Sequence, residues 1–217
     1  MKRVLLWLFA LSTLLPSSSA IAWGADTSML RPPKGSKVAI IVFEDMECPD
    51  CARAAPVLHK AAQDYKIPLV QHDFPLPQHP WSFEAAVNAR YFDTKSAKLG
   101  DDYRLYIFQN QPYITKQNLR GYTERFAEQN KVALPFVVDP SGELTAKVEA
   151  DRQLGQRIPL DHTPTIYLVG DTAHGTQILE VKDRTQLYQM LDQLVKEAAN
   201  APPEHKAVAS RKTSHGQ

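Results

Sequence analysis

Apolar residues follow two different spacings in the first half of the chain. Val38–Phe43 is a continuous apolar run rich in β-branched residues, which predicts a buried strand. Ala52–Lys66 repeats apolar side chains at helical spacing and predicts a helix. Ile67–Phe74 predicts a second strand, and Pro68 restricts that strand to starting there. The pattern therefore predicts the order strand, helix, strand for residues 38–74.

The middle of the chain changes to a helical pattern. Trp81–Phe92, Lys98–Asn110 and Lys116–Asn130 each place aromatic and aliphatic residues on one side of a helix. Such aromatic stripes are typical of core packing rather than of a cofactor site. The segment Phe136–Leu144 can be interpreted as strand, turn and strand, because its Asp-Pro-Ser-Gly sequence favours a turn. We favour a short turn followed by a helix over Glu143–Arg157.

The C-terminal third predicts a hairpin and a last helix. Ile166–Val169 has the pattern of a strand, Gly170–Gly175 that of a turn, and Thr176–Val181 that of an antiparallel partner strand. Asp183 is a candidate helix cap, with Gln186 at the position of a capping box. The apolar residues that follow recur at i, i+3, i+4, i+7 and i+8 and predict a helix with one buried side.

Both ends of the chain differ from this patterned region. Residues 1–22 combine a basic start, the apolar run Val4–Leu15 and the A-x-A pattern Ala20-Ile21-Ala22, which are the three parts of a signal peptide. The apolar run is too short to span a bilayer as a helix. We expect export and cleavage near Ala22; the alternative is an uncleaved anchor. Residues 23–37 are interpreted as an extended arm, and 201–217 as a disordered tail.

Charge and length narrow the function classes. Removal of residues 1–22, which hold two basic side chains and no acid, leaves 195 residues with a net charge of −1. Such a balance offers no electrostatic basis for binding nucleic acid or an anionic membrane surface. The length suits one domain with an insertion, and we expect a monomer.

The candidate chemistry is concentrated in Cys48-Pro49-Asp50-Cys51, which holds both cysteines of the chain. The pair lies where the first strand turns into the first helix, and a helix N-terminus stabilises a thiolate. A redox pair is the favoured interpretation. The alternatives are half of a zinc site, completed by histidines such as His59 or His72, and a structural disulfide. Haem attachment needs a histidine directly after the second cysteine, where Ala52 stands. Export favours the redox interpretation, since exported compartments allow disulfides to persist.

These motifs resemble the DsbA-like branch of the thioredoxin superfamily. Cys48–Cys51 is similar to its CPxC pattern, Phe74–Pro80 to the proline-rich entry to its helical insert, and Thr163-Pro164 to its cis-proline loop. The resemblance covers about residues 37–200. It implies an α/β thioredoxin fold with an inserted helical domain. The expected division is 38–80 for the first half of the thioredoxin fold, 81–133 for the insertion, and 134–200 for a helical segment and the second half.

The resemblance also implies roles. Cys48 would be the nucleophile and Cys51 the resolving cysteine, with no cofactor and no metal. Pro164 would follow a cis peptide bond, and the Thr163 backbone would pair with an extended substrate peptide. The implied function is disulfide exchange with cysteine-containing exported proteins, most readily as a periplasmic oxidase that a membrane redox partner recharges. A reductase or an isomerase is the alternative within the class. A metal-binding or peptide-binding chaperone module is the alternative outside it.

Two departures from the family pattern concern the tuning of the cysteines. Val42 stands six positions before Cys48, where related enzymes carry a buried acid, and Glu44 is the candidate substitute if the strand stays regular. Between the cysteines, beside Pro49, Asp50 stands where strong oxidants carry histidine. Negative charge near a thiolate raises the thiol pKa. We therefore predict a less depressed Cys48 pKa, and a less oxidising disulfide, than in the histidine-containing oxidases.

Overall fold

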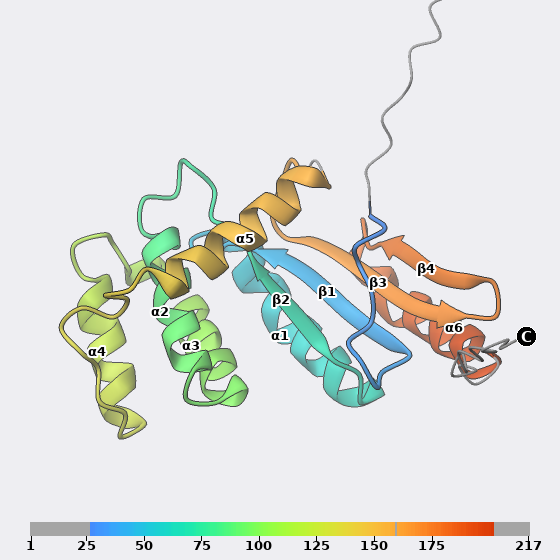
Figure 1. Cartoon of the computed structure of the whole chain (residues 1–217), viewed down its shortest axis with the longest axis horizontal. Helices are drawn as coiled ribbons and strands as arrows, with labels where there is room; N and C mark the ends of the chain where they lie inside the picture. The colour runs from blue at the N-terminus through green and yellow to red at the C-terminus, as the bar shows by residue number, and fades with distance from the viewer. Residues whose placement is uncertain (1–26, 159, 202–217) are drawn as a thin grey trace, which may run out of the picture.

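The computed structural model describes residues 27–158 and 160–201 (Figure 1). The predicted signal peptide, the first residues of the predicted arm and the predicted tail after residue 201 lie outside the described residues. None of the described helices is long and apolar enough to cross a membrane.

A mixed four-stranded sheet in the order β2-β1-β3-β4 forms the centre of the fold. Its strands are β1 (Val38–Glu44), β2 (Leu69–Asp73), β3 (Thr165–Thr172) and β4 (Gly175–Glu180). β1 and β2 are parallel, and helix α1 (Pro49–Tyr65) makes the crossover that parallel strands require. β3 pairs antiparallel with both β1 and β4.

The β3–β4 hairpin is confirmed, but its turn is shorter than the pattern predicted. Gly170, Asp171 and Thr172 continue β3, because they pair with Gln177, Thr176 and Gly175 across the hairpin. Only residues 173–174 form the turn.

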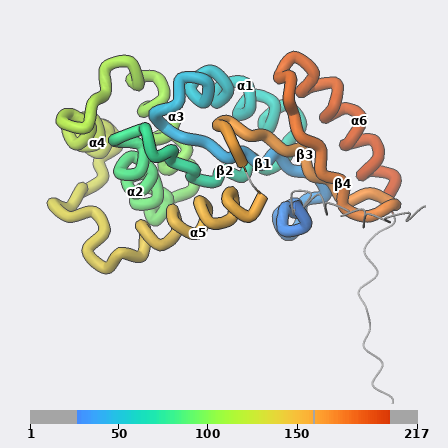
Figure 2. Tube along the Cα trace, turned by 90° about the horizontal axis from the view of Figure 1, so that it is seen from above, coloured from blue at the N-terminus to red at the C-terminus, as the bar shows by residue number. Residues whose placement is uncertain are grey.

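Alternation along β1 assigns its side chains to the two faces of the sheet. Val38, Ile40 and Val42 pack against α1 and against α6 (Leu187–Ala199). Ala39, Ile41 and Phe43 pack on the opposite face, which α5 (Glu143–Arg157) and the N-terminal segment around Leu30 cover. Figure 2 shows α1 and α6 on one side of the strands and α5 on the other. The sheet is therefore enclosed between two apolar layers.

Three helices between β2 and β3 form the helical insertion that the family resemblance implied. They are α2 (Ser82–Asp93), α3 (Ala97–Asn110) and α4 (Leu119–Gln129), to one side of the sheet in Figure 1. Their aromatic residues pack in a core, with ring centroids of Phe92, Tyr103 and Phe126 between 4.7 and 5.2 Å apart. The α5 helix has the bounds that the pattern predicted, so the strand–turn–strand alternative for this segment is wrong.

Three predicted helix starts are wrong by more than one residue. The helix expected from Ala52 begins at Pro49, a residue type favoured in the first helical position. The helix expected from Lys116 begins at Leu119, because Asn118 Oδ1 accepts the Thr115 N–H at 2.7 Å and closes a separate turn. Asp183 caps a short 3-10 helix, η2 (Arg184–Gln186), by accepting the Thr185 N–H at 2.9 Å. Gln186 makes no capping bond, and α6 begins after it.

Close packing of α5 on the sheet leads to a stability prediction at Gly155. A Cβ atom added there would lie 2.4 Å from Cε2 of Phe74, whereas one added at Gly121 in α4 would lie 3.6 Å from its nearest neighbour, Arg125 Nη1. Overpacking a core costs about 1–3 kcal/mol, and alanine gains up to about 1 kcal/mol over glycine within a helix. We expect Gly155→Ala to lower the free energy of unfolding by about 1–2 kcal/mol.

Gly121→Ala is the matched control and should raise the free energy of unfolding by about 0.5–1 kcal/mol in the same urea titration. Equal effects of the two substitutions would contradict this packing of α5.

Candidate active site

The two cysteines occupy the first turn of α1, at the junction between the sheet and the inserted helices. Cys48 is the N-cap residue of α1, and Pro49 is its first helical residue. Both thiols are free, and Cys48 is 8% and Cys51 1% exposed. The Asp45 N–H donates to Cys51 Sγ at 3.4 Å. Both cysteines belong to the apolar cluster of the insertion, so the insertion covers one side of the site.

The loop before β3 lies directly against Cys48. The Thr163–Pro164 peptide bond is cis, as the resemblance implied. The Cys48 thiol donates to the Thr163 carbonyl at 3.2 Å, although the two residues are 115 positions apart in the chain. The Thr163 hydroxyl is buried and has no hydrogen-bond partner among the described residues.

Two open hollows flank this loop. One, of about 460 Å³, is lined by residues that include Asp50, Pro164 and Arg184. The other, of about 470 Å³, lies toward Tyr167 and Glu180, and His162 borders both. An extended peptide placed along the loop would thus have space on both sides of the loop.

Hydrogen bonds lower the pKa of Cys48 to about 5. The hydrogen bond from the Cys51 thiol is the largest cause, and burial opposes it. The backbone N–H groups of Cys51 and Asp50 also favour the thiolate. Pro49 lacks an N–H group and contributes only by starting the helix. At neutral pH, Cys48 is therefore a thiolate.

Cys51 is shifted in the opposite direction. Burial raises its pKa most, and the hydrogen bond to Cys48 and the Cys48 charge raise it further. Cys51 is thus the thiol that keeps its proton when the pair is reduced.

Glu44 lies at the end of β1, and the strand stays regular to that point, so its side chain shares a face with Val42. It is 3% exposed, and burial raises its pKa to about 8. The Gln71 amide donates to Glu44 Oε1 at 3.1 Å, and Arg104 Nε lies 3.8 Å from the same oxygen. The Glu44 charge is among the causes that raise the Cys51 pKa, which places the two groups within electrostatic reach. Glu44 is therefore a buried acid near Cys51.

Asp50 does not present the uncompensated charge that the sequence argument assumed. Arg184 binds both of its carboxylate oxygens, at 2.7 and 2.8 Å, and Arg53 Nη2 lies 3.1 Å from Oδ1. The hydrogen bond from Arg184 is the main cause that lowers the Asp50 pKa. The charge of Asp50 next to Cys48 is thus neutralised, which corrects the premise of the predicted tuning. That the Cys48 pKa is less depressed, and the disulfide less oxidising, than in histidine-containing oxidases stays a prediction.

Asp45, which the sequence analysis did not single out, joins the segments around the site. Its carboxylate accepts the N–H groups of Glu47 and Leu76, each at 2.7 Å, and contacts His79 Nδ1 at 2.7 Å and the Ser82 hydroxyl. The loop before α1 is therefore tied to the proline-rich segment and to the start of α2. The only sequence signal was an acid directly after a buried strand.

Gln111, at the end of the α3 segment, is a second residue that the sequence analysis missed. Its amide donates to the carbonyls of Met46 at 2.8 Å and Cys48 at 3.0 Å. The insertion therefore fixes the backbone of Cys48.

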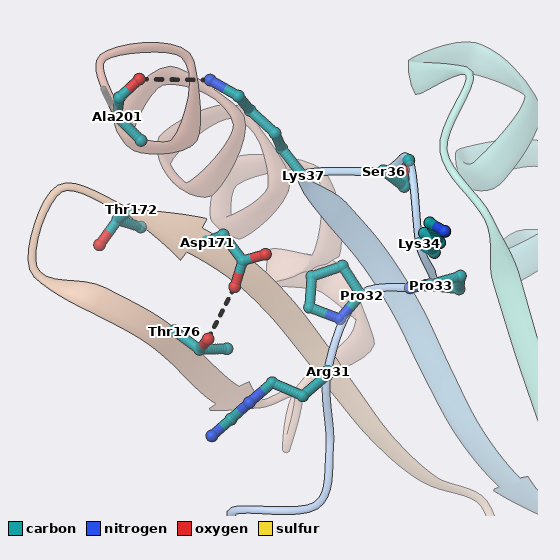
Figure 3. A pocket seen from close by; sticks show the side chains of 11 residues that line it. Arg31, Pro32, Pro33, Lys34, Ser36, Lys37, Asp171, Thr172, Thr176 and Ala201 are labelled. Carbon is teal, nitrogen blue, oxygen red and sulfur yellow. Dashed lines mark hydrogen bonds between the residues drawn. The ribbon is translucent and has the colours of Figure 1, made fainter. Parts of the chain in front are cut away.

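The described residues offer no alternative centre built on a metal. Within residues 27–158 and 160–201, no three His, Cys, Asp or Glu side chains form a group that could hold a metal ion. His72, a candidate zinc partner, contacts Asp151 at 2.7 Å instead. A larger hollow of about 720 Å³ lies at the other end of β1, between residues 31–37 and the β3–β4 hairpin (Figure 3). It contains neither cysteine nor Pro164, so the candidate chemistry lies elsewhere.

Comparison with known proteins agrees with this geometry. The family model described as Thioredoxin matches residues 25–193. Among solved structures, alpha-DsbA1 from Wolbachia pipientis is 15% identical with a TM-score of 0.61, over 78% of this chain and 91% of that one. A periplasmic thioredoxin-like protein from Salmonella enterica serovar Typhimurium is 17% identical with a TM-score of 0.60, over 77% and 88%. DsbA2 from Pseudomonas aeruginosa is 19% identical with a TM-score of 0.53, over 75% and 91%. At these identities the structures show a shared fold.

Two curated relatives carry the names of transporters. The Na(+)/H(+) antiporter NhaA 3 of Salinispora tropica is 22% identical over 85% of this chain, and NhaA 1 of Salinispora arenicola is 24% identical over 71%. The matched regions make up 28% and 24% of those proteins. The chain thus spans about a quarter of the length of the curated relatives that it matches.

The two thiols should titrate far apart. In the reduced protein, we expect alkylation of Cys48 by iodoacetamide to rise with a midpoint near pH 5, because the site stabilises the thiolate. The folded pKa lies below the unfolded value of about 8.5, so Cys48 should add stability as pH rises from about 5 to about 9 and lose that contribution as pH falls through 5.

A Cys48→Ser variant supplies the control for both measurements. Its Cys51 should stay unreactive through pH 9, and its stability should lack the Cys48 contribution. A Cys48 midpoint at or above pH 7 would contradict the described hydrogen bonding.

Proposed function

The chain belongs to the thioredoxin family, and from this premise we propose that it is a thiol–disulfide oxidoreductase acting through Cys48 and Cys51. One observation carries the proposal: the two thiols of one helical turn have pKa values shifted in opposite directions, with the lower one beside a cis-proline loop. Such a pair has a reactive nucleophile and a protected resolving thiol. A structural disulfide does not require two thiols whose pKa values differ in this way.

The proposed reaction begins with the oxidised pair. A substrate thiolate attacks Cys48 Sγ, a mixed disulfide forms, and Cys51 leaves as a thiolate that takes up a proton. A second thiolate of the substrate attacks the substrate sulfur of the mixed disulfide, and Cys48 departs as a thiolate. The substrate loses two electrons and gains a disulfide. The Thr163 backbone holds the substrate as an added extended strand.

Glu44 is the proposed proton donor and acceptor for Cys51. A carboxyl group with a pKa of about 8 is protonated at neutral pH and can supply the proton that the leaving Cys51 requires. Gln71 and Arg104 hold the carboxyl group in place from the neighbouring strand and from the insertion. Glu44 would thus fill the role of the acid that Val42 replaces.

Oxidation of exported proteins is the direction that we propose. A stabilised Cys48 thiolate stabilises the reduced protein, which makes the disulfide an oxidant. Cysteine-containing exported proteins would be the substrates, and a membrane redox partner would restore the disulfide. The periplasmic location given for the Salmonella neighbour supports an extracytoplasmic site for this chain, after cleavage of residues 1–22. A reductase, with the same site kept reduced by another donor, is the second candidate.

The redox equilibrium of Cys48 and Cys51 with glutathione tests the proposal. A potential above about −200 mV would support an oxidase, and one near −270 mV or below would support the reductase. The oxidase and the reductase proposals would both be overturned if the protein showed no reversible exchange with glutathione and its reduced form bound zinc or copper stoichiometrically. That result would favour a metal-binding module.

A Cys51→Ser variant should trap substrates. Without the resolving thiol, mixed disulfides on Cys48 cannot be released from the protein side, so covalent adducts should accumulate under mild oxidation and disappear on reduction. Non-reducing electrophoresis measures them, and Cys48→Ser is the control that should trap nothing. Equal trapping by both variants would sink the assignment of Cys48 as the nucleophile.

A Glu44→Gln variant should slow the step that involves Cys51. General acid–base catalysis contributes about 10²–10⁴-fold, and we expect a loss toward the lower end because water can replace the carboxyl group in part. Stopped-flow oxidation of the reduced protein by glutathione disulfide measures the ring-closing step across pH 6–9. The pH dependence near 8 should disappear in the variant, while the alkylation midpoint of Cys48 stays in place. An unchanged pH profile would rule out this role for Glu44.

A further inference from the structure

Arg184 lies far from the cysteines in sequence but contacts the residue between them. It is the first residue of η2, in the connection between β4 and α6. Its Nη1 and Nη2 atoms bind Oδ2 and Oδ1 of Asp50 at 2.8 and 2.7 Å, across 134 positions of the chain. This two-point contact between a planar guanidinium and a carboxylate fixes the orientation as well as the distance of both groups.

The connection that carries Arg184 is itself held in place. Asp183 Oδ1 accepts the Thr185 N–H at 2.9 Å and the Thr185 hydroxyl at 2.7 Å. Arg184 and Asp50 line the hollow of about 460 Å³ beside Pro164. The ion pair is therefore part of the wall along which a substrate would approach Cys48.

Several charged groups lie on the elements around Cys48. The charged and titratable side chains on the elements around it are Glu44, Asp45, Glu47, Asp50, Cys51, Arg53, Asp161, His162, Lys182, Asp183 and Arg184. Asp50 is the acid in the helical turn of the nucleophile, and without a cation it would oppose the thiolate. The hydrogen bond to Asp50 is the first cause of the raised Arg184 pKa, and the Cys48 charge also contributes. Arg184 therefore lies within electrostatic reach of Cys48.

We propose that Arg184 is a positioning residue of the redox pair, which neutralises and orients Asp50 so that a CPDC sequence keeps a stabilised Cys48 thiolate. The proposal rests on the proposed function. It adds that the redox potential is set in part by a residue outside the CxxC motif and outside the cis-proline loop.

Two single substitutions that should shift the Cys48 pKa in opposite directions test this role. Arg184→Met leaves Asp50 with Arg53 alone, which is more exposed, so the Cys48 pKa should rise by about one unit. Asp50→Asn leaves Arg184 without its carboxylate, so the Cys48 pKa should fall. The double variant Asp50→Asn with Arg184→Met should return close to the wild-type value. Arg184→Lys, which keeps the charge but loses the two-point contact, should lie between wild type and Arg184→Met.

Thiolate absorbance of the reduced protein against pH measures these shifts without turnover. The equilibrium constant with glutathione should follow, and the disulfide of Arg184→Met should become about tenfold harder to reduce, which corresponds to about 30 mV. Both effects should shrink at about 1 M salt, because the pair is partly exposed. Lys60→Met is the matched control. It removes an exposed cation of α1 that is paired with Asp64 and lies about 18 Å along the helix axis from Cys48. It should change neither the Cys48 pKa nor the equilibrium constant with glutathione.

Shifts of the same sign in Arg184→Met and Asp50→Asn, or no shift in either, would overturn the proposal, because a purely structural contact would act alike when either partner is lost. The proposed function fails on a different outcome. It is excluded if the wild-type protein shows no reversible exchange with glutathione, whatever the thiol pKa values are.

Discussion

A thiolate that is shielded from water has to be held by hydrogen bonds, because burial alone raises the pKa of a thiol. Cys48 meets this condition at the N-terminus of α1, where the Cys51 thiol and backbone N–H groups converge on its sulfur. The Thr163 carbonyl lies 3.2 Å from the same sulfur. Strand β1 sets the start of α1, and pairing of β1 with β3 sets the loop that precedes β3. The sheet therefore matters to the chemistry chiefly because it brings two loops, 115 residues apart, into contact.

A second set of buried charges lies beneath the cysteines and joins the insertion to the sheet. Arg104 of α3 is 1% exposed; its guanidinium lies 3.1 Å from Asp93, 3.5 Å from Asp73 and 3.8 Å from Glu44. Burial opposes its charge, but these carboxyl groups raise its pKa, with Asp73 contributing most. Removing one partner from a buried group of this kind typically costs about 3–5 kcal/mol. The insertion is thus bound to the sheet by the same network that keeps Glu44 near Cys51, and the fold and the proposed proton transfer depend on one set of contacts.

Local patterns predicted the parts of this site that depend on neighbouring residues. The β-branched run before Cys48 and the helical spacing after it placed the cysteines on a strand-to-helix turn, and the spacing of Leu144, Val148 and Leu154 set the bounds of α5. The cis bond at Pro164 came from the family resemblance, since the residues alone allow an ordinary trans proline. Asp45 and Gln111 escaped prediction for a physical reason. Gln111 binds backbone carbonyls of a distant segment, and backbone groups leave no mark in a sequence. Asp45 binds Leu76, His79 and Ser82, which only the fold brings close to it.

The pairing of Asp50 with Arg184 was missed for a similar reason. Counting acids near the CxxC motif treats each charge as if it acted through water on its nearest neighbour in sequence. In the fold, Asp50 is paired with Arg184, which comes from the far end of the chain, and Glu44 is neutral at pH 7 because burial has raised its pKa. What acts on Cys48 is the charge that remains after tertiary pairing, and after protonation of buried acids. Residues within a CxxC motif therefore set the properties of the pair only together with the side chains that the fold places against them.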